Sequence, residues 1–370
     1  MTHGLLPSGL RDRLAPEAAA LDALQRLAMD RIAARGYLRV QPPLAEFEDG
    51  LAERLKGAGK SEMFRAVDPV SAKTLAMRPD ITAQISRIAT AQLGGAARPL
   101  RLTYAGQVLK LRATMLRPER ELTQIGAEII GNDGEPAAIE AITLALDILT
   151  TLGVEGLAVD LTLPDLVTHL AQGPLPIAAD RIDAVRTALD AKDVAALTAL
   201  GAENFLPLLR AAGPLPAALD ALAALNLPLI ETRLDAIRSI TTALDGKARL
   251  MLDPGERHGF EYQTWLGFSL FGSGVSGEIG RGGSYTIVHA DGREEAAIGF
   301  SLYLDPLIDA GSGQAKTKRL FLPLDTTGHE AASLRAEGWI TVAALSAHDD
   351  PAALACTHIL TANGPKALAD

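Results

Sequence analysis

The 370-residue sequence predicts an α+β fold in which helices flank an antiparallel sheet. Long strand-like runs alternate apolar with polar residues, as in 259–271, where Phe260, Leu266 and Leu270 share one side. The helical segments do not alternate regularly with the strands, as they would in a doubly wound parallel sheet. A helical stretch rich in alanine and leucine, residues 165–245, separates two groups of strands.

Apolar residues three or four positions apart predict three helices in the N-terminal part of the chain. The first begins at Pro16, carries a stripe that includes Leu24 and Ile32, and is expected to end at Gly36. The elements expected here are a helix at 16–35, strands at 37–40, 63–67 and 74–78, a helix at 81–93, strands at 100–110 and 123–131, and a helix at 136–152.

Strands return after the helical insertion. They are expected at 248–252, 259–271 and 284–289, with Gly280, Gly282 and Gly283 just before the last of them, and a core helix is expected at 298–310. Residues 311–314 are typical of a linker. The runs RLFLPL, HEAASLRAEG and ITVAAL then predict a small C-terminal α/β unit. We therefore expect a core domain over 1–310, with its insertion at about 165–245, and a second domain over 316–370.

Composition excludes several classes of protein. Hydrophobic residues make up 48% and charged residues 22%, so a packed core is expected and not a disordered chain. The single cysteine, Cys356, excludes an intrachain disulfide and a cysteine zinc cluster, and is expected to be a small buried residue. The seven histidines show no metal-ligand spacing, and phosphate-loop, nucleophile-elbow and H-E-x-x-H motifs are absent, so neither a metal nor a cofactor is expected.

The charge balance argues against two kinds of partner. The formal net charge of −10 opposes non-specific binding to nucleic acid or to an anionic membrane. No stretch of about 18 apolar residues is free of charge, and the first residues do not form a targeting signal. We expect a cytoplasmic protein that binds neither nucleic acid nor membrane.

Four segments carry a family resemblance: LAMRPDITAQISRIA (75–89), RLTYAGQVLK (101–110), LTQIGAEIIG (122–131) and GEIGRGGSYT (277–286). With GYLRVQPPLAEFE (36–48) before them and AAIGFSLYLDPL (296–307) after them, their order resembles the core of the class II histidyl-tRNA synthetases. The sequence resembles still more closely a paralogous family, the regulatory subunits of ATP phosphoribosyltransferase. The resemblance covers about residues 5–165 and 248–310.

The resemblance implies a six-stranded antiparallel sheet, a self-dimer formed around Pro43, and a histidine pocket. Carried over position by position, the histidine-binding residues are Asp80, Thr82, Gln124, Glu128, Tyr262 and Tyr285. These side chains suit the ligand, because carboxylates can bind an ammonium or an imidazole N–H by charge-assisted hydrogen bonds, and an amide both donates and accepts. Without a ligand or water, such groups would be unpaired in a cleft, and each unpaired group would cost roughly 1–3 kcal/mol of free energy.

The sequence departs from the synthetases where they bind ATP. Those enzymes use an arginine in the second motif and another in the third. Here the second-motif position is Lys110, Arg112 stands at an acidic position beside it, and the third motif reads Gly299-Phe300-Ser301-Leu302-Tyr303 without an arginine. His258 stands where the histidine-specific motif has arginine. Loss of one preorganised donor costs roughly 10²–10³ in rate, so aminoacylation is not expected.

Several pocket residues also have a purely structural interpretation. Asp80 could be only a helix cap. Gln124 and Glu128 stand four apart on a strand and would share a face in any sheet. Tyr262 and its neighbour Gln263 cannot both point into one pocket from a regular strand.

Two other segments are equally open to interpretation. The pair Gly282-Gly283 could be a turn or a bulge, or could let a ligand approach the backbone. The charged loop that contains Arg112, Arg117 and Arg120 could be solvated, or could face a partner or a nucleotide phosphate.

These observations predict a non-catalytic regulatory subunit. It would bind and activate a short-form ATP phosphoribosyltransferase catalytic chain in the first step of histidine biosynthesis, and would take part in feedback inhibition by L-histidine. Two-fold dimers of this chain would combine with dimers of the catalytic chain into a hetero-oligomer. The alternatives are an active histidyl-tRNA synthetase-like ligase and a free-standing amino-acid-binding paralogue of the synthetases.

Overall fold

The computed structural model describes residues 5–52, 63–112, 118–256, 263–313 and 317–368. Their contacts divide the chain into two compact units, Met1–Gly313 and Gln314–Asp370. The predicted Tyr262, Arg117 and His258 lie outside the described residues. Within the described ranges, every helix is too short or too polar to cross a lipid bilayer.

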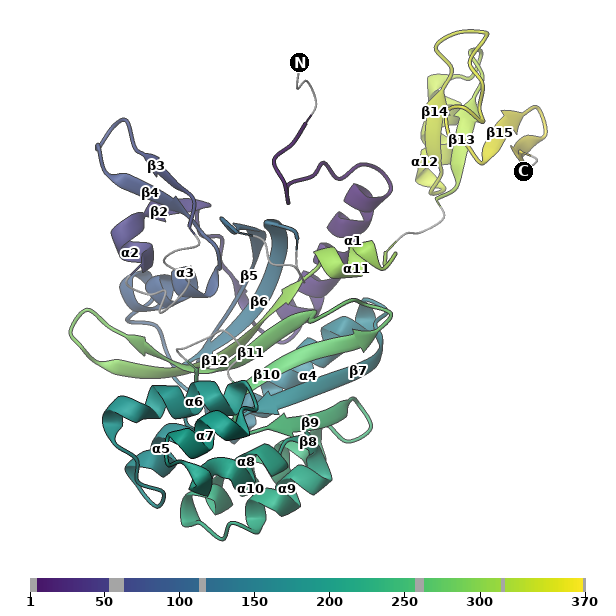
Figure 1. The fold of residues 1–370 in the computed structure, drawn as a ribbon. Helices are drawn as coiled ribbons and strands as arrows, with labels where there is room; N and C mark the ends of the chain where they lie inside the picture. The colour runs from purple at the N-terminus through teal and green to yellow at the C-terminus, as the bar shows by residue number, and fades with distance from the viewer. Residues whose placement is uncertain (1–4, 53–62, 113–117, 257–262, 314–316, 369–370) are drawn as a thin grey trace. The chain divides into compact units, whose positions relative to one another are not determined.

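A mixed sheet forms the centre of the first unit (Figure 1). Its middle six strands are antiparallel, in the order β5 (Leu100–Leu109), β6 (Glu121–Ile130), β12 (Glu294–Tyr303), β11 (Gly280–Val288), β10 (Gln263–Ser273) and β7 (Glu155–Thr162). The expected six-stranded sheet is therefore extended, because the described residues add parallel β1 (Leu38–Arg39) at one edge, and parallel β9 (Arg249–Asp253) and antiparallel β8 (Gly213–Pro214) at the other.

Strand β6 shows how the sheet separates the core from the candidate site. Its odd-numbered residues Ile125, Ala127 and Ile129 are buried in the main apolar core, together with α1 (Glu17–Ala33) and α4 (Glu135–Thr151). Its even-numbered residues Gln124 and Glu128 therefore face the opposite side. That side carries α3 (Thr82–Arg87), the π-helical turn η2 (Ile88–Gln92), and a small sheet of β2 (Ala45–Phe47), β4 (Thr74–Met77) and β3 (Arg65–Val67).

The insertion is helical, as predicted, and extends the same core. Its larger elements are α5 (Leu166–Gln172), α6 (Ile182–Asp190), α7 (Val194–Ala199), α8 (Leu206–Arg210), α9 (Leu215–Ala223) and α10 (Pro228–Ala243). Helix α10 packs against α4 and α9 packs against β9 (Figure 1). Leu222 and Ile237 from these two helices belong to the apolar cluster that contains Ile142 of α4.

The second unit is a small α/β sheet covered by one helix. Strands β13 (Arg319–Leu322), β14 (Ile340–Ala343) and β15 (His358–Thr361) are parallel, and β16 (Gly364–Ala367) pairs antiparallel with β15. Helix α12 (Gly328–Ala336) contributes Ala331 and Leu334 to the apolar core. The two last strands were not foreseen.

Two sequence expectations are wrong around β11 and β12. The segment expected to be a core helix at 298–310 begins with the second half of strand β12, which ends at Tyr303, and only its later part is helical, in the short helix α11 (Asp305–Asp309). A short apolar run does not distinguish a buried strand from a buried helix, and pairing with both β6 and β11 decides for the strand. The glycines expected before a strand lie inside β11, where a Cβ at Gly280 or Gly282 would overlap the backbone of β12.

Candidate functional site

A small polar pocket lies on the face of the sheet that carries α3. Strands β6, β10, β11 and β12 form its floor, and Thr82 comes from the first turn of α3. Its described lining residues are Thr82, Glu128, Gln263, Arg281, Gly282, Gly283, Tyr285, Gly299, Phe300 and Ser301. The three glycines bring backbone atoms of β11 and β12 to the pocket wall.

Glu128 is the buried acid of this pocket. The hydroxyls of Tyr104 and Tyr285 donate to its two oxygens at 3.2 and 3.0 Å. Among the described residues, it forms no ion pair with a lysine or an arginine. Burial raises the pKa of Glu128 to about 8, and the negative charge of Asp80 adds to this, whereas the hydrogen bonds from Tyr285 and Tyr104 lower it. The carboxyl is therefore mostly protonated at pH 7.

Asp80 links the start of α3 to Gln124 of β6. Its Oδ1 accepts the backbone N–H of Thr82 at 2.7 Å, at the start of α3. Its Oδ2 accepts from Nε2 of Gln124 at 2.9 Å. The other end of the Gln124 amide accepts the backbone N–H of Ile81 at 3.0 Å, so Gln124 fixes the start of the helix against β6.

Two further hydroxyls complete the network and were missed by the sequence analysis. The Tyr104 hydroxyl lies 3.2 Å from that of Thr82 and 2.9 Å from that of Ser301. Ser301 also accepts from Gln124 at 2.7 Å. Tyr104 and Ser301 each stand opposite Gly126 in the strand register, and a Cβ on Gly126 would overlap the Tyr104 ring. Only this cross-strand register, not spacing along the chain, identifies them.

The pocket is closed around its own side chains. Its free volume is about 20 Å³, which is room for one water. The acids, the amide and the phenols are paired with one another, so the expectation that they would be unpaired without a ligand is wrong.

The structure brings together five of the six predicted histidine-binding residues: Asp80, Thr82, Gln124, Glu128 and Tyr285. The sixth, Tyr262, lies outside the described residues. Its neighbour Gln263 reaches the pocket, where its Nε2 donates to the carbonyl of Gly282 at 2.8 Å.

The neighbouring part of the sheet face is apolar. Tyr303, at the end of the third motif, is buried in a cluster with Val108 and Leu122. The described ranges contain no group of three His, Cys, Asp or Glu side chains placed to hold a metal ion.

Arg120 of the predicted partner-facing loop is engaged inside the fold. Its guanidinium donates to the carbonyls of Ser8 at 3.2 Å and Lys110 at 3.3 Å, and lies 4.9 Å from the ring centre of Phe64. Arg112 is exposed. The contact of Arg120 with the N-terminal segment was not foreseen from the sequence, because that segment is more than a hundred positions away in the chain.

Comparison with known proteins decides the family. The histidyl-tRNA synthetase family model matches residues 9–307. A protein of Rhodospirillum centenum is 41% identical over 96% of this chain and 94% of its own length, and one of Paramagnetospirillum magneticum is 41% identical over 98% and 97%. Both are named ATP phosphoribosyltransferase regulatory subunit. The chain belongs to this family of regulatory subunits. It thus has a non-catalytic, regulatory role in ATP phosphoribosyltransferase, in histidine biosynthesis.

Solved structures share the fold of this chain. The crystal structure of an ATP phosphoribosyltransferase regulatory subunit/histidyl-tRNA synthetase from Bacillus halodurans aligns with a TM-score of 0.83 at 22% identity, over 95% of this chain and 96% of that one. Histidyl-tRNA synthetase from Nostoc aligns with a TM-score of 0.77 at 15% identity, over 97% and 91%. The predicted family, class II synthetase-like fold and regulatory role are confirmed.

Proposed function

We propose that this chain binds and activates a catalytic chain of ATP phosphoribosyltransferase, and that histidine binding to the regulatory subunit contributes to feedback inhibition. The observation that carries the proposal is a polar pocket that lies beside an apolar part of the sheet face. Glu128, Gln124 and Asp80 keep the pocket polar, whereas Tyr303 and Leu122 bury apolar surface next to it. A side chain set of this kind suits binding of an amino acid without its activation by ATP.

The contact with the catalytic chain would include the loop 112–121 and the face opposite Pro43. Arg112 is exposed there, whereas Arg120 supports the loop from within. An exposed cation at the rim speeds association with an acidic partner, and its effect weakens with salt.

A self-dimer around Pro43 is part of the proposal. A recess of about 600 Å³ opens beside this residue and is lined by Pro42, Leu44 and Arg78, among others. Leu38 and Leu44, on either side of the recess in sequence, are 62% and 47% exposed. Burial of these apolar side chains in a two-fold interface would complete the edge of the sheet at β1.

Complex formation is tested by size-exclusion chromatography with light scattering. The chain alone is expected to elute with the mass of a dimer, and a mixture with a short-form catalytic chain is expected to elute as one larger species. Separate elution at micromolar concentrations of both chains would contradict the proposal.

Histidine would enter the pocket by displacing contacts that the chain now makes with itself. A volume of about 20 Å³ cannot hold an amino acid, so the hydroxyls of Tyr285 and Tyr104 must give way at Glu128. A cationic ammonium or an imidazole N–H beside Glu128 favours its ionised form. Binding at pH 7 is therefore coupled to release of a proton from this carboxyl.

Calorimetry in buffers of different ionisation enthalpy tests this prediction. The unmodified chain, alone or with the catalytic chain, is expected to release a proton on binding histidine, and Glu128→Gln to bind it about 10- to 100-fold more weakly without that release. Glu140→Gln is the control, because Glu140 accepts from Arg101 on the opposite face of the sheet. Equal histidine affinity in both variants would exclude this pocket as the site.

A further inference from the structure

The helix that supplies Thr82 to the pocket changes from α-helical to π-helical winding after six residues. Helix α3 ends at Arg87 and continues as the π-helical turn η2, in which the N–H of Leu93 donates to the carbonyl of Ile88 at 2.9 Å. The Thr90 hydroxyl donates to the carbonyl of Ser86 at 3.0 Å. Such π-helical turns are rare in proteins, and many of those that do occur lie at functional sites.

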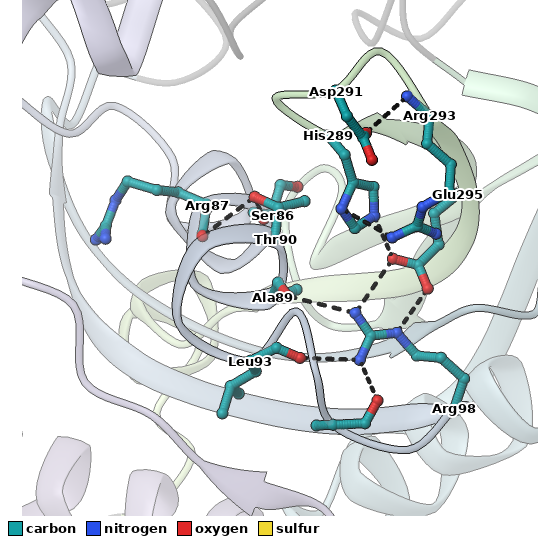
Figure 2. A network of polar contacts seen from close by, with 11 residues as sticks. Ser86, Arg87, Ala89, Thr90, Leu93, Arg98, His289, Asp291, Arg293 and Glu295 are labelled. Carbon is teal, nitrogen blue, oxygen red and sulfur yellow. Dashed lines mark hydrogen bonds and ion pairs between the residues drawn. The ribbon is translucent and has the colours of Figure 1, made fainter.

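Arg98 holds the end of this turn. Its guanidinium donates to the carbonyls of Ala96 at 2.9 Å, Leu93 at 3.1 Å and Ala89 at 3.3 Å. The same group forms a two-fold contact with Glu295, with distances of 2.6 and 3.2 Å. Figure 2 shows the guanidinium between the helical carbonyls and this carboxylate. Arg98 therefore joins the pocket helix to the first residues of β12.

His289, in the β11–β12 turn, supports Glu295 from the other side. Its Nε2 lies 2.8 Å from the Glu295 carboxylate, and its Nδ1 lies 3.0 Å from a guanidinium nitrogen of Arg293 (Figure 2). A guanidinium only donates, so Nδ1 must accept and the ring proton is on Nε2, which donates to Glu295. The side chains of Glu295 and His289 are only 6% and 8% exposed.

We propose that Arg98, Glu295 and His289 form a positioning network for the pocket. One side of the pocket is Thr82 on α3, and the other is Tyr285, Gly299 and Ser301 on β11 and β12. The network joins the C-terminal end of the helix formed by α3 and η2 to the turn end of the β11–β12 hairpin. It thereby fixes the separation of the two walls, and with it the ease with which the pocket opens. The part of this inference that concerns histidine binding rests on the proposed function.

Substitution of Glu295 tests how the network holds the two walls of the pocket, because Glu295 contacts both Arg98 and His289. Arg98 fixes its charge, since the hydrogen bond from this guanidinium lowers the pKa of Glu295. Glu295→Gln keeps the shape but leaves the Arg98 cation without its carboxylate. Glu140→Gln is the matched control, because Glu140 also binds an arginine in two-fold fashion, at 2.7 Å from both nitrogens, and a third donor, Tyr37 at 2.9 Å. That second group lies away from the pocket.

Amide hydrogen exchange in the full-length chain, without ligand, tests the network directly. Glu295→Gln is expected to increase exchange at residues 85–93 at least tenfold, whereas Glu140→Gln leaves these amides unchanged. A second pair of variants makes a smaller change. His289→Gln retains a donor to Glu295, so its amides at residues 85–93 should exchange more slowly than those of His289→Ala. Equal exchange at 85–93 in Glu295→Gln and Glu140→Gln, or in the two His289 variants, would overturn the inference.

Histidine affinity, measured by calorimetry on the same proteins, separates this inference from the proposed function. If the unmodified chain binds histidine, Glu295→Gln is expected to change that affinity about tenfold and Glu140→Gln is not; equal affinity in the two would overturn the positioning role. If neither the unmodified chain nor its complex binds histidine, the histidine proposal fails, and the exchange result still decides whether the network holds the helix.

Discussion

Replacement of Glu128 by glutamine is expected to raise the free energy of unfolding at pH 9 by about 5 kcal/mol, and to change it by less than about 1 kcal/mol at pH 5. Glu128 is buried without an ion-pair partner among the described residues, and burial raises its pKa from the usual 4.5 to about 8. Glutamine has nearly the same shape and can hydrogen bond to Tyr104 and Tyr285 in the same place.

The direction of this pH dependence follows from the raised pKa. The folded chain retains the Glu128 proton up to about pH 8, whereas the unfolded chain loses it near pH 4.5. The contribution of this group to stability is therefore full below pH 4.5, declines as the pH rises, and levels off above pH 8. The difference of about 3.5 pH units corresponds to about 5 kcal/mol. Glutamine does not ionise, so the variant escapes this decline.

Urea unfolding at pH 5, 7 and 9 measures the effect, with Glu140→Gln as a control of opposite sign. The hydrogen bond from Arg101 lowers the pKa of Glu140, so this carboxylate stabilises the fold above its unfolded pKa and ceases to do so as the pH falls. Glu140→Gln should therefore be less stable than the unmodified chain at pH 7, with a smaller difference at low pH. Parallel stability curves for Glu128→Gln and the unmodified chain would contradict a neutral, buried Glu128.

Histidine-dependent exchange of pyrophosphate into ATP is expected to be at least 10³-fold slower than for a functional histidyl-tRNA synthetase. Each preorganised cation removed from a reacting centre costs roughly 10²–10³ in rate. Lys110 stands where the synthetases have one such arginine. The third motif contains no arginine, and its last residue, Tyr303, is buried with Val108 beside the pocket. The pocket would thus bind an amino acid without the two motif arginines that the synthetases use for ATP.

The assay uses the purified chain at high concentration, with a histidyl-tRNA synthetase at the same concentration as the positive control. Single substitutions at Lys110→Arg and Tyr303→Arg are informative as well, because neither alone should restore exchange. Exchange within tenfold of the synthetase would show that the apolar face does not prevent activation.

Strand periodicity predicted that Gln124 and Glu128 share one face of a strand, and the family resemblance assigned both to a pocket. Gln124 and Glu128 share a face because they are four residues apart on one strand, and this holds in any sheet. Tyr104 and Ser301 could not be found this way, because both meet Gly126 only through the order and register of β5, β6 and β12. The family resemblance added the pocket residues that spacing alone could not select.

The remaining differences have a common physical cause, which is contact between segments distant in sequence. The apolar run in β12 was expected to be a helix, and its pairing with strands on both sides makes it a strand. From the sequence, His289 had no role beyond a position on the surface or in packing, yet a hairpin turn places it against Glu295, which binds Arg98 nearly two hundred positions away. Arg120, expected in a partner-facing loop, also holds the N-terminal segment through the carbonyl of Ser8.

The formation of phosphoribosyl-ATP by a short-form catalytic chain is the most direct test of the central claim. Turnover should be measured for the catalytic chain alone, with this regulatory chain, and with both chains plus histidine. We expect a clear gain in turnover on addition of this chain, and suppression of that gain by histidine in the unmodified complex but not with Glu128→Gln. No gain in turnover under conditions where the two chains could form a complex would contradict the account; a gain that histidine leaves unchanged would remove the sensor role and retain the activator role.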